Sequence, residues 1–389
     1  MIRRTIEPKL LELARTFPVV TIEGPRQSGK TTLAKATFPG WAYANLEDSA
    51  TRLLAERDEE AFFERFPSPC VIDEIQRVPS LLGAIQVRVD RDGGNGRFVL
   101  TGSHQPRLKE GIAQTLAGRT ALLRLLPFSI EELASAGIPP KRDELIHTGF
   151  LPAIYDRGQL PEDAWEGYYR TYVERDVRDL VQIVHQGQFE LFVRLLAGRV
   201  GSLVNLESMS GDVGVSSTTL KQWLAVLEAS FVVFRLPPYY NNFGKRFVKT
   251  PKIYFTDVGL AAHLLGIETP EQTARDPLAG GLFENLVVVE ALKARLNAGK
   301  APDLYFIRDK AGLEIDLALD VRRRLRLFEI KRAQTPDDSL AANLRKFAKS
   351  VDAVDSMAVV YSGEAWPIAG GGRFIPFRDT AAAIRESDG

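Results

Sequence analysis

Eight consecutive residues, 24-GPRQSGKT-31, carry the clearest chemical pattern in the sequence. They fit GxxxxGK[ST] in full, follow an apolar run at 19-VVTIE-23 and precede a helical pattern at 30-KTTLAKA-36. In such a loop, glycines let backbone N–H groups close around phosphates, and the next helix adds the positive end of its dipole. The pattern predicts an ATP site, with Lys30 on the β- and γ-phosphates and the Thr31 hydroxyl on Mg²⁺. The residues expected to bind ATP are Gly24, Pro25, Arg26, Gln27, Ser28, Gly29, Lys30, Thr31 and Thr32, although the motif does not fix the side chains of Arg26 and Gln27.

A second apolar run, 70-CVIDEIQ-76, ends in two carboxylates. A P-loop site needs an acidic residue on a neighbouring strand for Mg²⁺ and a group that orients the attacking water. We expect Asp73 to hold the metal and Glu74 to act as the general base. Asp-Glu after a strand also suits a helix N-terminus, but the preceding P-loop favours the catalytic interpretation.

Polar residues beside two further apolar runs are candidates for contacts with the γ-phosphate. Thr101 and Ser103, in 98-FVLTGSH-104, are expected sensors, although hydroxyls there also cap turns. Arg119 is a candidate arginine finger on a neighbouring subunit or a sensor in its own chain. A structural arginine paired with a carboxylate is an equally good interpretation. Weaker candidates for the same role are Arg88, Arg91 and Arg107.

A different set of charges lies near the other end, in 314-EIDLALDVRRRLRLFEIKRA-333. If a hairpin loop is centred on the first two arginines of the RRR run, Asp316 lies opposite Glu329, and Glu314 lies opposite Lys331. Arg-Arg is not a favoured two-residue loop, which argues against this register. Directly opposed carboxylates repel each other, so a shared cation is a natural explanation for the pattern.

The elements that must position these residues follow from the alternation of patterns. Residues 1–134 alternate apolar runs with amphipathic stretches, which predicts an α/β fold with a parallel sheet and helices on both faces. Residues 135–185 contain a long helical pattern at 164–184. Residues 186–262 are mostly helical and end in two strand-like runs, and residues 263–389 alternate helix and strand again.

Composition sets broad limits on the class of protein. A chain of 389 residues predicts two to four domains, and equal counts of basic and acidic residues, 50 each, do not indicate a nucleic-acid partner. One cysteine excludes a disulfide framework. No segment approaches the roughly 18 uninterrupted apolar residues of a spanning helix, and no signal peptide is evident, so we expect a cytoplasmic protein without a membrane partner.

In combination, several motifs resemble a large group of prokaryotic AAA-type ATPases that carry a C-terminal domain of unknown function. The resemblance implies an AAA-type ATPase domain (1–134), a helical lid or linker (135–185), a winged helix (186–262) and a C-terminal domain similar to PD-(D/E)xK, restriction-endonuclease-like nucleases (263–389). The motifs that carry it are TIEGPRQSGKTTL, VIDEIQ, LTGSH, LAGRTALLRLLPFSIEEL, GFLP, PKIYFTDVGL and FENLVV.

PD-(D/E)xK nucleases carry a helix Glu, a strand Asp and then Glu-x-Lys. By this resemblance, Glu284, Asp316 and Glu329 are expected to bind Mg²⁺ or Mn²⁺, and Lys331 to stabilise charge or position water. Glu284 is also interpretable as favourable charge in the first turn of a helix at 282–296. Glu329 and Lys331 also suit a surface ion pair on a solvated sheet face. Such folds persist as binding modules too, so the resemblance leaves cleavage open.

Residues 203–230 show the sequence pattern of a helix-turn-helix, with two helical stretches separated by a short turn. The first helix is expected from about Leu206 to Asp212, followed by a turn at 213-VGVS-216 and a second helix capped by Ser216 or Ser217. If the segment binds DNA, the second helix enters the major groove and a wing contacts phosphates. The alternative is packing or protein contact. The candidate DNA-binding residues are Thr218, Thr219, Lys221 and Gln222 on the helix and Lys245, Arg246 and Lys249 on the wing.

Taken together, these patterns predict an ATPase that acts on nucleic acid, most simply DNA. We expect a homo-oligomer that uses ATP and Mg²⁺ for binding, remodelling or metal-dependent cleavage, with Mn²⁺ as a possible metal of the C-terminal site. The alternative is an ATP-regulated switch that binds protein, with an inert nuclease-like domain, in a defence or stress system.

Overall fold

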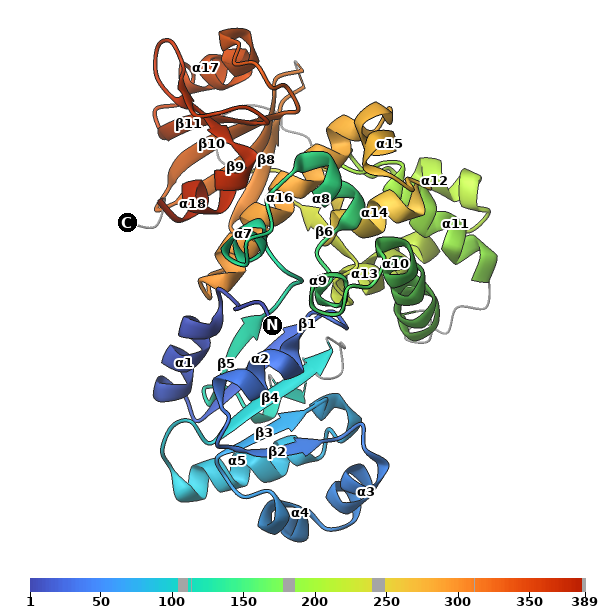
Figure 1. Ribbon diagram of the computed structural model, residues 1–389, viewed down its shortest axis with the longest axis vertical. Helices are drawn as coiled ribbons and strands as arrows, with labels where there is room; N and C mark the ends of the chain where they lie inside the picture. The colour runs from blue at the N-terminus through green and yellow to red at the C-terminus, as the bar shows by residue number, and fades with distance from the viewer. Residues whose placement is uncertain (104–110, 113, 178–185, 240–248, 311, 387–389) are drawn as a thin grey trace. The chain divides into compact units, whose positions relative to one another are not determined.

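The computed structural model describes residues 1–103, 111–112, 114–177, 186–239, 249–310 and 312–386 (Figure 1). Among these residues, no helix combines the length and the apolar character needed to cross a membrane. The chain divides into two compact units. The first comprises Met1–Phe128, Ala229–Phe231 and Leu296–Lys300, and the second comprises Ser129–Glu228, Val232–Arg295 and Ala301–Gly389.

The first unit is built on a five-stranded parallel sheet with the strand order β2-β3-β4-β1-β5 (Figure 1). Its strands are β1 (Val19–Gly24), β2 (Ala42–Asn45), β3 (Cys70–Asp73), β4 (Phe98–Ser103) and β5 (Thr120–Arg124). Its helices are α1 (Glu7–Thr16), α2 (Lys30–Thr37), α3 (Ser49–Arg57), α4 (Glu59–Arg65), α5 (Leu81–Asp92) and the short 3₁₀ helix η1 (Ile75–Arg77). Each strand lies on one of the apolar runs of the sequence.

Two separate cores explain why these strands lack polar positions. On one face of the sheet, Val19, Ile72 and Leu100 pack with apolar side chains of α3, α4 and α5. On the other face, Val20 and Val99 pack with α1 and α2. Strands that are buried on both faces read as continuous apolar runs. The predicted parallel sheet with helices on both faces is therefore confirmed.

The single cysteine, Cys70, begins β3 and is fully buried in the first of these cores. Burial raises the pKa of its thiol to about 12. The thiol is therefore a small core side chain, because the charged thiolate is disfavoured in apolar surroundings.

The second unit begins with helices and ends in a six-stranded sheet of order β12-β13-β11-β10-β9-β8. Its first helices are α7 (Ile130–Ser135), α8 (Arg142–Thr148), α9 (Pro152–Arg157), α10 (Pro161–Tyr168), the π-helix η2 (Tyr169–Val177), α11 (Gln186–Ala197), α12 (Leu206–Val213) and α13 (Ser217–Ala229). The remaining elements are β6 (Val233–Leu236), β7 (Lys252–Phe255), α14 (Val258–Leu264), α15 (Pro270–Arg275), α16 (Ala279–Asn297), β8 (Leu304–Arg308), β9 (Glu314–Val321), β10 (Arg324–Lys331), η3 (Asp338–Ala341), α17 (Ala342–Ala348), β11 (Val354–Tyr361), β12 (Trp366–Pro367), β13 (Arg373–Pro376), η4 (Phe377–Asp379) and α18 (Thr380–Arg385).

The helix predicted over 164–184 is not one continuous α-helix. The α-helical part ends at Tyr168, and the backbone continues as a π-helix to Val177. Residues 178–185 lie outside the described part of the chain.

The helix-turn-helix pattern produces two helices and a turn where the sequence predicts them. Helix α12 ends at Val213 and is capped by Gly214, whose φ of +78° favours glycine. The Ser216 hydroxyl then accepts a hydrogen bond from the Thr219 N–H at 3.1 Å and caps α13. Strands β6 and β7 pair antiparallel, while Lys245 and Arg246 of the predicted wing lie outside the described residues.

Strands β9 and β10 form the predicted hairpin in the predicted register, with Leu317 opposite Phe328. The two loop residues, Arg322 and Arg323, have φ of +53° and +66°. Positive φ at both positions is the I′ geometry that matches the twist of paired strands. The Arg323 N–H also donates to the Asp320 carboxylate at 3.0 Å, which helps to hold an unfavoured loop sequence in this geometry.

Candidate functional site

The phosphate-binding pattern forms a tight loop between β1 and α2. Gln27 and Gly29 both have positive φ, at +61° and +91°. Gly24 allows no side chain, because a Cβ there would lie 2.1 Å from the Leu125 carbonyl oxygen. The Ser28 hydroxyl donates to the Pro25 carbonyl at 3.0 Å and closes the loop. The backbone is therefore held in one curved shape at the start of a helix, as an anion site requires.

Lys30 folds back into this loop. Its Nζ donates to the Gly24 and Pro25 carbonyl oxygens at 3.1 and 2.7 Å, and the residue is 5% exposed. Burial lowers the pKa of Lys30 to about 8, although the nearby Glu74 and Asp73 carboxylates act in the opposite direction. A buried ammonium held by two neutral carbonyls gains charge stabilisation when a phosphate arrives, so this loop fits ATP.

The predicted metal residues of the ATP site lie together. The Thr31 hydroxyl is 2.9 and 3.0 Å from the two oxygens of Asp73, which is buried. Asp73 also accepts hydrogen bonds from the hydroxyls of Tyr43, at 2.8 Å, and Thr101. Hydroxyl and carboxylate oxygens are the ligands that Mg²⁺ prefers, so Thr31 and Asp73 fit this ion. Sequence reasoning missed Tyr43, which lies in the run 42-AYANL-46 and in no motif.

Glu74 follows Asp73 in the chain, and one of the two candidate sensors, Thr101, contacts both residues. Glu74 has a left-handed backbone, with φ of +58°, and its N–H donates to the Thr101 hydroxyl at 3.2 Å. A non-glycine residue in this conformation is uncommon and is often found at functional sites. Gln76 donates a hydrogen bond to the Glu74 carboxylate. Thr101 therefore links Asp73 and Glu74, while the buried Ser103 hydroxyl has no hydrogen-bond partner among the described residues.

Arg119 has a partner in its own chain. Its Nε and one Nη donate to the two oxygens of Asp90 on α5 at 2.6 and 2.8 Å, and its other Nη donates to the Ala117 carbonyl at 3.1 Å. The pair is partly exposed, since the two side chains are 33% and 46% accessible. The weaker candidates also have acidic neighbours, Glu60 for Arg88 and Asp92 for Arg91, while Arg107 lies outside the described residues.

Arg4 supports the phosphate loop and was not found from the sequence. Its guanidinium donates to the Ser28 carbonyl at 2.7 Å and to the Leu126 carbonyl at 2.6 Å. The group is buried and lies 5.0 Å from the centre of the Phe128 ring. One side chain therefore ties the loop to the segment that follows β5. Nothing in the N-terminal residues marks Arg4, because its partners lie far along the sequence.

The second group of predicted residues also lies together, on the β9–β10 hairpin and α16. Lys331 Nζ is 3.2 Å from Asp316 and 2.8 Å from Glu329. Glu329 is only 4% exposed, so the interpretation as a solvated face is wrong for it, whereas the Lys331 side chain is 36% exposed and forms the expected ion pair with Glu329. Helix α16 begins at Ala279, which places Glu284 beyond the first turn. Its expected position in the first turn is therefore wrong, and N-terminal helix charge does not explain it.

Lys252, at the start of β7, lies among these carboxylates. Its Nζ is 2.9 Å from Glu284, 2.7 Å from Glu314 and 3.8 Å from Asp316, and its side chain is 3% exposed. Within the described residues, no set of three His, Cys, Asp or Glu side chains is arranged to hold a metal ion. The predicted metal set of Glu284, Asp316 and Glu329 therefore does not fit a metal in this geometry, because Lys252 pairs with Glu284 and Lys331 pairs with Asp316 and Glu329.

The titration of this cluster reflects its burial. Burial raises the pKa of Glu329 to about 7, and the nearby Asp316 acts in the same direction. Burial also raises the pKa of Glu284. Burial alone would lower the pKa of Lys252, but Glu284, Asp316 and Glu314 together raise it above its ordinary value. Burial would also lower the pKa of Lys331, but Asp316 and Glu329 raise it above its ordinary value. Lys252 and Lys331 therefore stay charged near neutral pH, where Glu329 is partly protonated.

The candidate DNA-binding residues that the structure describes lie on a mixed-charge surface. Thr218, Lys221 and Gln222 are exposed on α13, and Lys249 is exposed before β7. The Thr219 hydroxyl instead lies 2.8 Å from the Ser216 hydroxyl in the cap. Acidic residues lie close by: Glu207 accepts a hydrogen bond from Ser217, and Asp212 pairs with Arg199.

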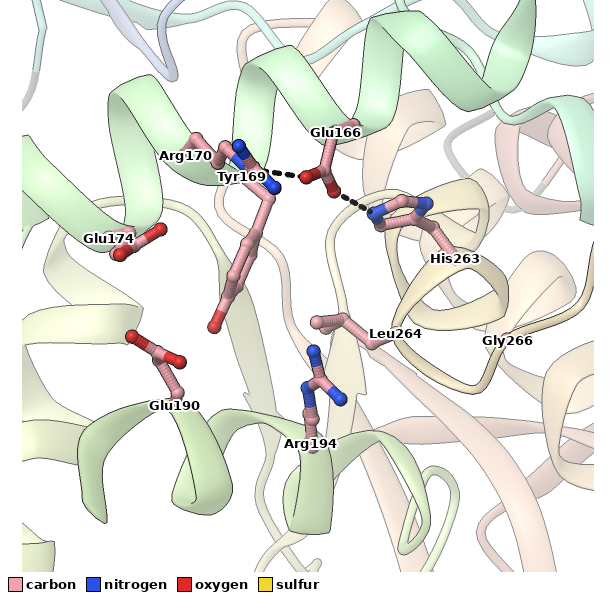
Figure 2. A pocket seen from close by; sticks show the side chains of 9 residues that line it. All are labelled: Glu166, Tyr169, Arg170, Glu174, Glu190, Arg194, His263, Leu264 and Gly266. Carbon is pink, nitrogen blue, oxygen red and sulfur yellow. Dashed lines mark ion pairs between the residues drawn. The ribbon is translucent and has the colours of Figure 1, made fainter. Parts of the chain in front are cut away.

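A cavity of about 460 Å³ in the second unit contains none of the predicted residues (Figure 2). Glu166 lies between Arg170 and His263, and the distance from its carboxylate to His263 Nε2 is 3.3 Å. The Tyr169 side chain points into the cavity, and its buried hydroxyl has no hydrogen-bond partner among the described residues. The lining mixes charges of both signs, so it indicates no particular class of ligand.

Comparisons with known proteins divide the chain into three parts. Residues 16–134 match a family described as AAA domain. Residues 140–271 and 279–379 match families described as Domain of unknown function (DUF8612) and Domain of unknown function (DUF4143).

Relatives match over nearly the whole chain. Uncharacterized proteins of Mycobacterium tuberculosis and Mycobacterium bovis are each 32% identical over 389 residues, which cover 98% of this chain and 83% of theirs. An uncharacterized protein of Haemophilus influenzae is 25% identical over 354 residues, which cover 80% of this chain and 85% of that protein. Among solved structures, the Walker-type ATPase PABY2304 of Pyrococcus abyssi matches at 14% identity with a TM-score of 0.44, over 67% of this chain and 94% of that one.

Proposed function

The chain belongs to the same family as the two mycobacterial proteins and carries an AAA-type P-loop ATPase domain, and from this premise we propose that it hydrolyses ATP and couples hydrolysis to action on nucleic acid. The observation that carries the ATPase proposal is the contact of the Thr31 hydroxyl with Asp73 at 2.9 and 3.0 Å, directly after Lys30 in the phosphate loop. This is the pair of oxygen ligands that a P-loop enzyme uses beside the β- and γ-phosphates.

In the proposed reaction, Lys30 and the loop N–H groups bind the phosphates. Thr31 and Asp73 would hold Mg²⁺, which supplies neutralisation of phosphate charge. The Glu74 carboxylate orients the attacking water and accepts its proton. Thr101 positions this base, because its hydroxyl holds the Glu74 N–H at 3.2 Å and also donates to Asp73.

Two substitutions separate binding from chemistry at this site. Lys30→Ala should remove nucleotide binding, because the phosphates lose a buried ammonium. Glu74→Gln should keep binding but lower the turnover by about 10²–10⁴, which is the usual contribution of a general base. Fluorescent-nucleotide titration and phosphate release measure the two effects. Hydrolysis by Glu74→Gln at the wild-type rate would show that another group activates the water.

Action on nucleic acid is proposed from the exposed end of α13, where Thr218, Lys221 and Gln222 follow a tight turn. With one lysine on this helix, binding should be driven by phosphate contacts and tolerant of sequence. The test is DNA-stimulated ATP hydrolysis at two salt concentrations. Lys221→Ala should weaken stimulation severalfold, whereas Lys346→Ala, which removes an exposed lysine of α17, should not.

A second candidate function is an ATP-regulated switch that binds protein. The observation that favours it is the buried Lys252 ammonium among the carboxylates of the C-terminal unit, which suits an inert domain better than a metal nuclease. DNA that leaves ATP hydrolysis unchanged, together with ATP-dependent capture of a protein by the Glu74→Gln variant, would favour this function over the first.

A further inference from the structure

In the second unit, the Lys252 ammonium contacts two carboxylate oxygens. Oε1 of Glu284 and Oε1 of Glu314 lie 2.9 and 2.7 Å from Lys252 Nζ, which are direct ion-pair distances. Asp316 Oδ1 is third in distance at 3.8 Å. A divalent ion that bound these same oxygens would have to occupy the volume that Nζ fills.

The position of this ammonium is built into the fold. The Lys252 backbone pairs with Leu236 of β6 and forms a bridge with Leu203, so the main chain is fixed on both sides. The side chain is 3% exposed, and Nζ lies 5.6 Å from the centre of the Phe306 ring. The Tyr254 hydroxyl donates to Glu284 Oε1 at 2.6 Å and holds that carboxylate toward Lys252. The ammonium is therefore held beside the carboxylates by contacts on several sides.

Most of the remaining charges of the cluster also have partners, although the buried Glu329 Oε2 accepts no hydrogen bond among the described residues. Lys331 bridges Asp316 and Glu329, the Ile330 N–H donates to Asp316 at 2.8 Å, and Arg308 lies 3.4 Å from Glu314. Three side-chain cations of the same unit, Lys252, Lys331 and Arg308, therefore face the four carboxylates, and burial raises the pKa of the fourth, Glu329, to about 7. A buried acidic cluster otherwise requires a metal to neutralise its charge.

We propose that Lys252 is the resident cation of the cluster formed by Glu284, Glu314, Asp316 and Glu329, and that the cluster consequently takes no divalent metal. In a metal-dependent nuclease a bound metal ion supplies the positive charge, whereas here a lysine side chain supplies it. This inference does not depend on the ATPase proposal, since all its residues belong to the second unit.

The test measures Mn²⁺ binding to the nucleotide-free full-length chain through the loss of the electron paramagnetic resonance signal of free Mn²⁺. Wild type and Asp316→Asn should give superimposable curves. Lys252→Met, which keeps the length of the stem and removes the charge, should gain one Mn²⁺ site at least tenfold tighter than any wild-type binding. Adding Asp316→Asn to Lys252→Met should abolish that site, and Lys252→Arg, which keeps the charge, should not create it.

Either of two results would overturn the proposal. The first is a wild-type Mn²⁺ site that Asp316→Asn removes, because the cluster would then accept a metal beside Lys252. The second is a folded Lys252→Met variant that gains no site. If circular dichroism shows that Lys252→Met does not fold, the comparison of wild type with Asp316→Asn decides the question alone.

Discussion

Lys30 is the residue whose protonation state has the most direct consequence for ligand binding. Burial lowers its pKa to about 8 in the nucleotide-free protein. Phosphate oxygens favour the charged form, so ATP must raise this pKa. Binding therefore takes up a proton wherever the free lysine is neutral.

The dissociation constant for ATP should be independent of pH below about 7 and should rise above about pH 8, by up to tenfold per pH unit. The sign follows because high pH removes the proton from the free protein and leaves the complex protonated. Calorimetry between pH 7 and 9.5, in buffers of different ionisation enthalpy, measures both the affinity and the proton uptake. Lys346→Ala, which removes an exposed lysine of the second unit, should keep the profile. A dissociation constant that stays flat to pH 9.5 would contradict the assignment.

Individual residues were predictable from the sequence where a motif fixes both chain position and role. The contact between Thr31 and Asp73 is of this kind, since each ends a pattern with a defined geometry. Tyr43, Arg4 and Lys252 were missed because their partners lie 24 or more positions away in the sequence and no local pattern encodes the contact. A lysine that begins the apolar run 252-KIYF-255 was the available signal of a buried cation.

At the scale of elements, the most constrained junction joins the loop after α8 to the start of α14. The Asp257 carboxylate accepts hydrogen bonds from the N–H groups of Phe150 and Gly259, both at 3.0 Å. Burial raises the pKa of Asp257 to about 6. The motifs 149-GFLP-152 and 251-PKIYFTDVGL-260 meet at this junction. The first supplies the Phe150 N–H, and the second supplies the Asp257 carboxylate and the Gly259 N–H.

Gly149→Ala should therefore destabilise the second unit by about 2 to 6 kcal/mol, which combines backbone strain with overpacking. The glycine has φ of +69°, and a Cβ would lie 2.5 Å from the Trp165 ring and 2.6 Å from Asp257 Oδ1. Gly93 is the matched control, because its backbone is nearly the same, with φ of +62° and ψ of −170° against +69° and −158°.

A Cβ at Gly93 would meet no atom within 4 Å. Gly93→Ala should therefore cost only the backbone term of about 1 to 3 kcal/mol. Urea unfolding of both variants measures the difference in the free energy of unfolding. Equal losses of stability would show that the corner around Asp257 is loosely packed.

Elements were predictable where apolar residues recur at a regular spacing along the sequence, and they were not predictable elsewhere. The alternation of side chains with period two placed the β9–β10 pairing correctly, even through an unfavoured Arg-Arg loop. The π-helix over Tyr169–Val177 was read as α-helix. Over nine residues the apolar spacing does not distinguish hydrogen bonds to the fifth residue from those to the fourth.

At the scale of the whole molecule, Arg119 is the residue that we expect to act on a neighbouring copy. In its own chain it is bound to Asp90. Exposed ion pairs contribute little to stability, so assembly could release the guanidinium toward a nucleotide on the next subunit.

If Arg119 acts in trans, a mixture of Lys30→Ala and Arg119→Ala chains should recover part of the ATPase activity that each variant lacks alone. One chain keeps the arginine and the other keeps a complete nucleotide site. A finger contributes about 10³–10⁵ in rate, so even partial recovery is measurable. Mixed oligomers, verified by two affinity tags, are required for the assay. No recovery in such oligomers would assign Arg119 a role within its own chain or in support of Asp90.

The single thiol has a consequence for following the first unit in solution. Cys70 begins β3, three positions before Asp73, and is buried. A thiol reagent can reach Cys70 only when β3 opens. The labelling rate therefore measures opening of the first unit and does not depend on opening of the second. Bound nucleotide slows such openings in proportion to the ratio of free nucleotide to its dissociation constant, by about a hundredfold at one hundred times that constant. The labelling rate of Cys70 therefore reports nucleotide binding to the phosphate loop without an introduced dye or cysteine.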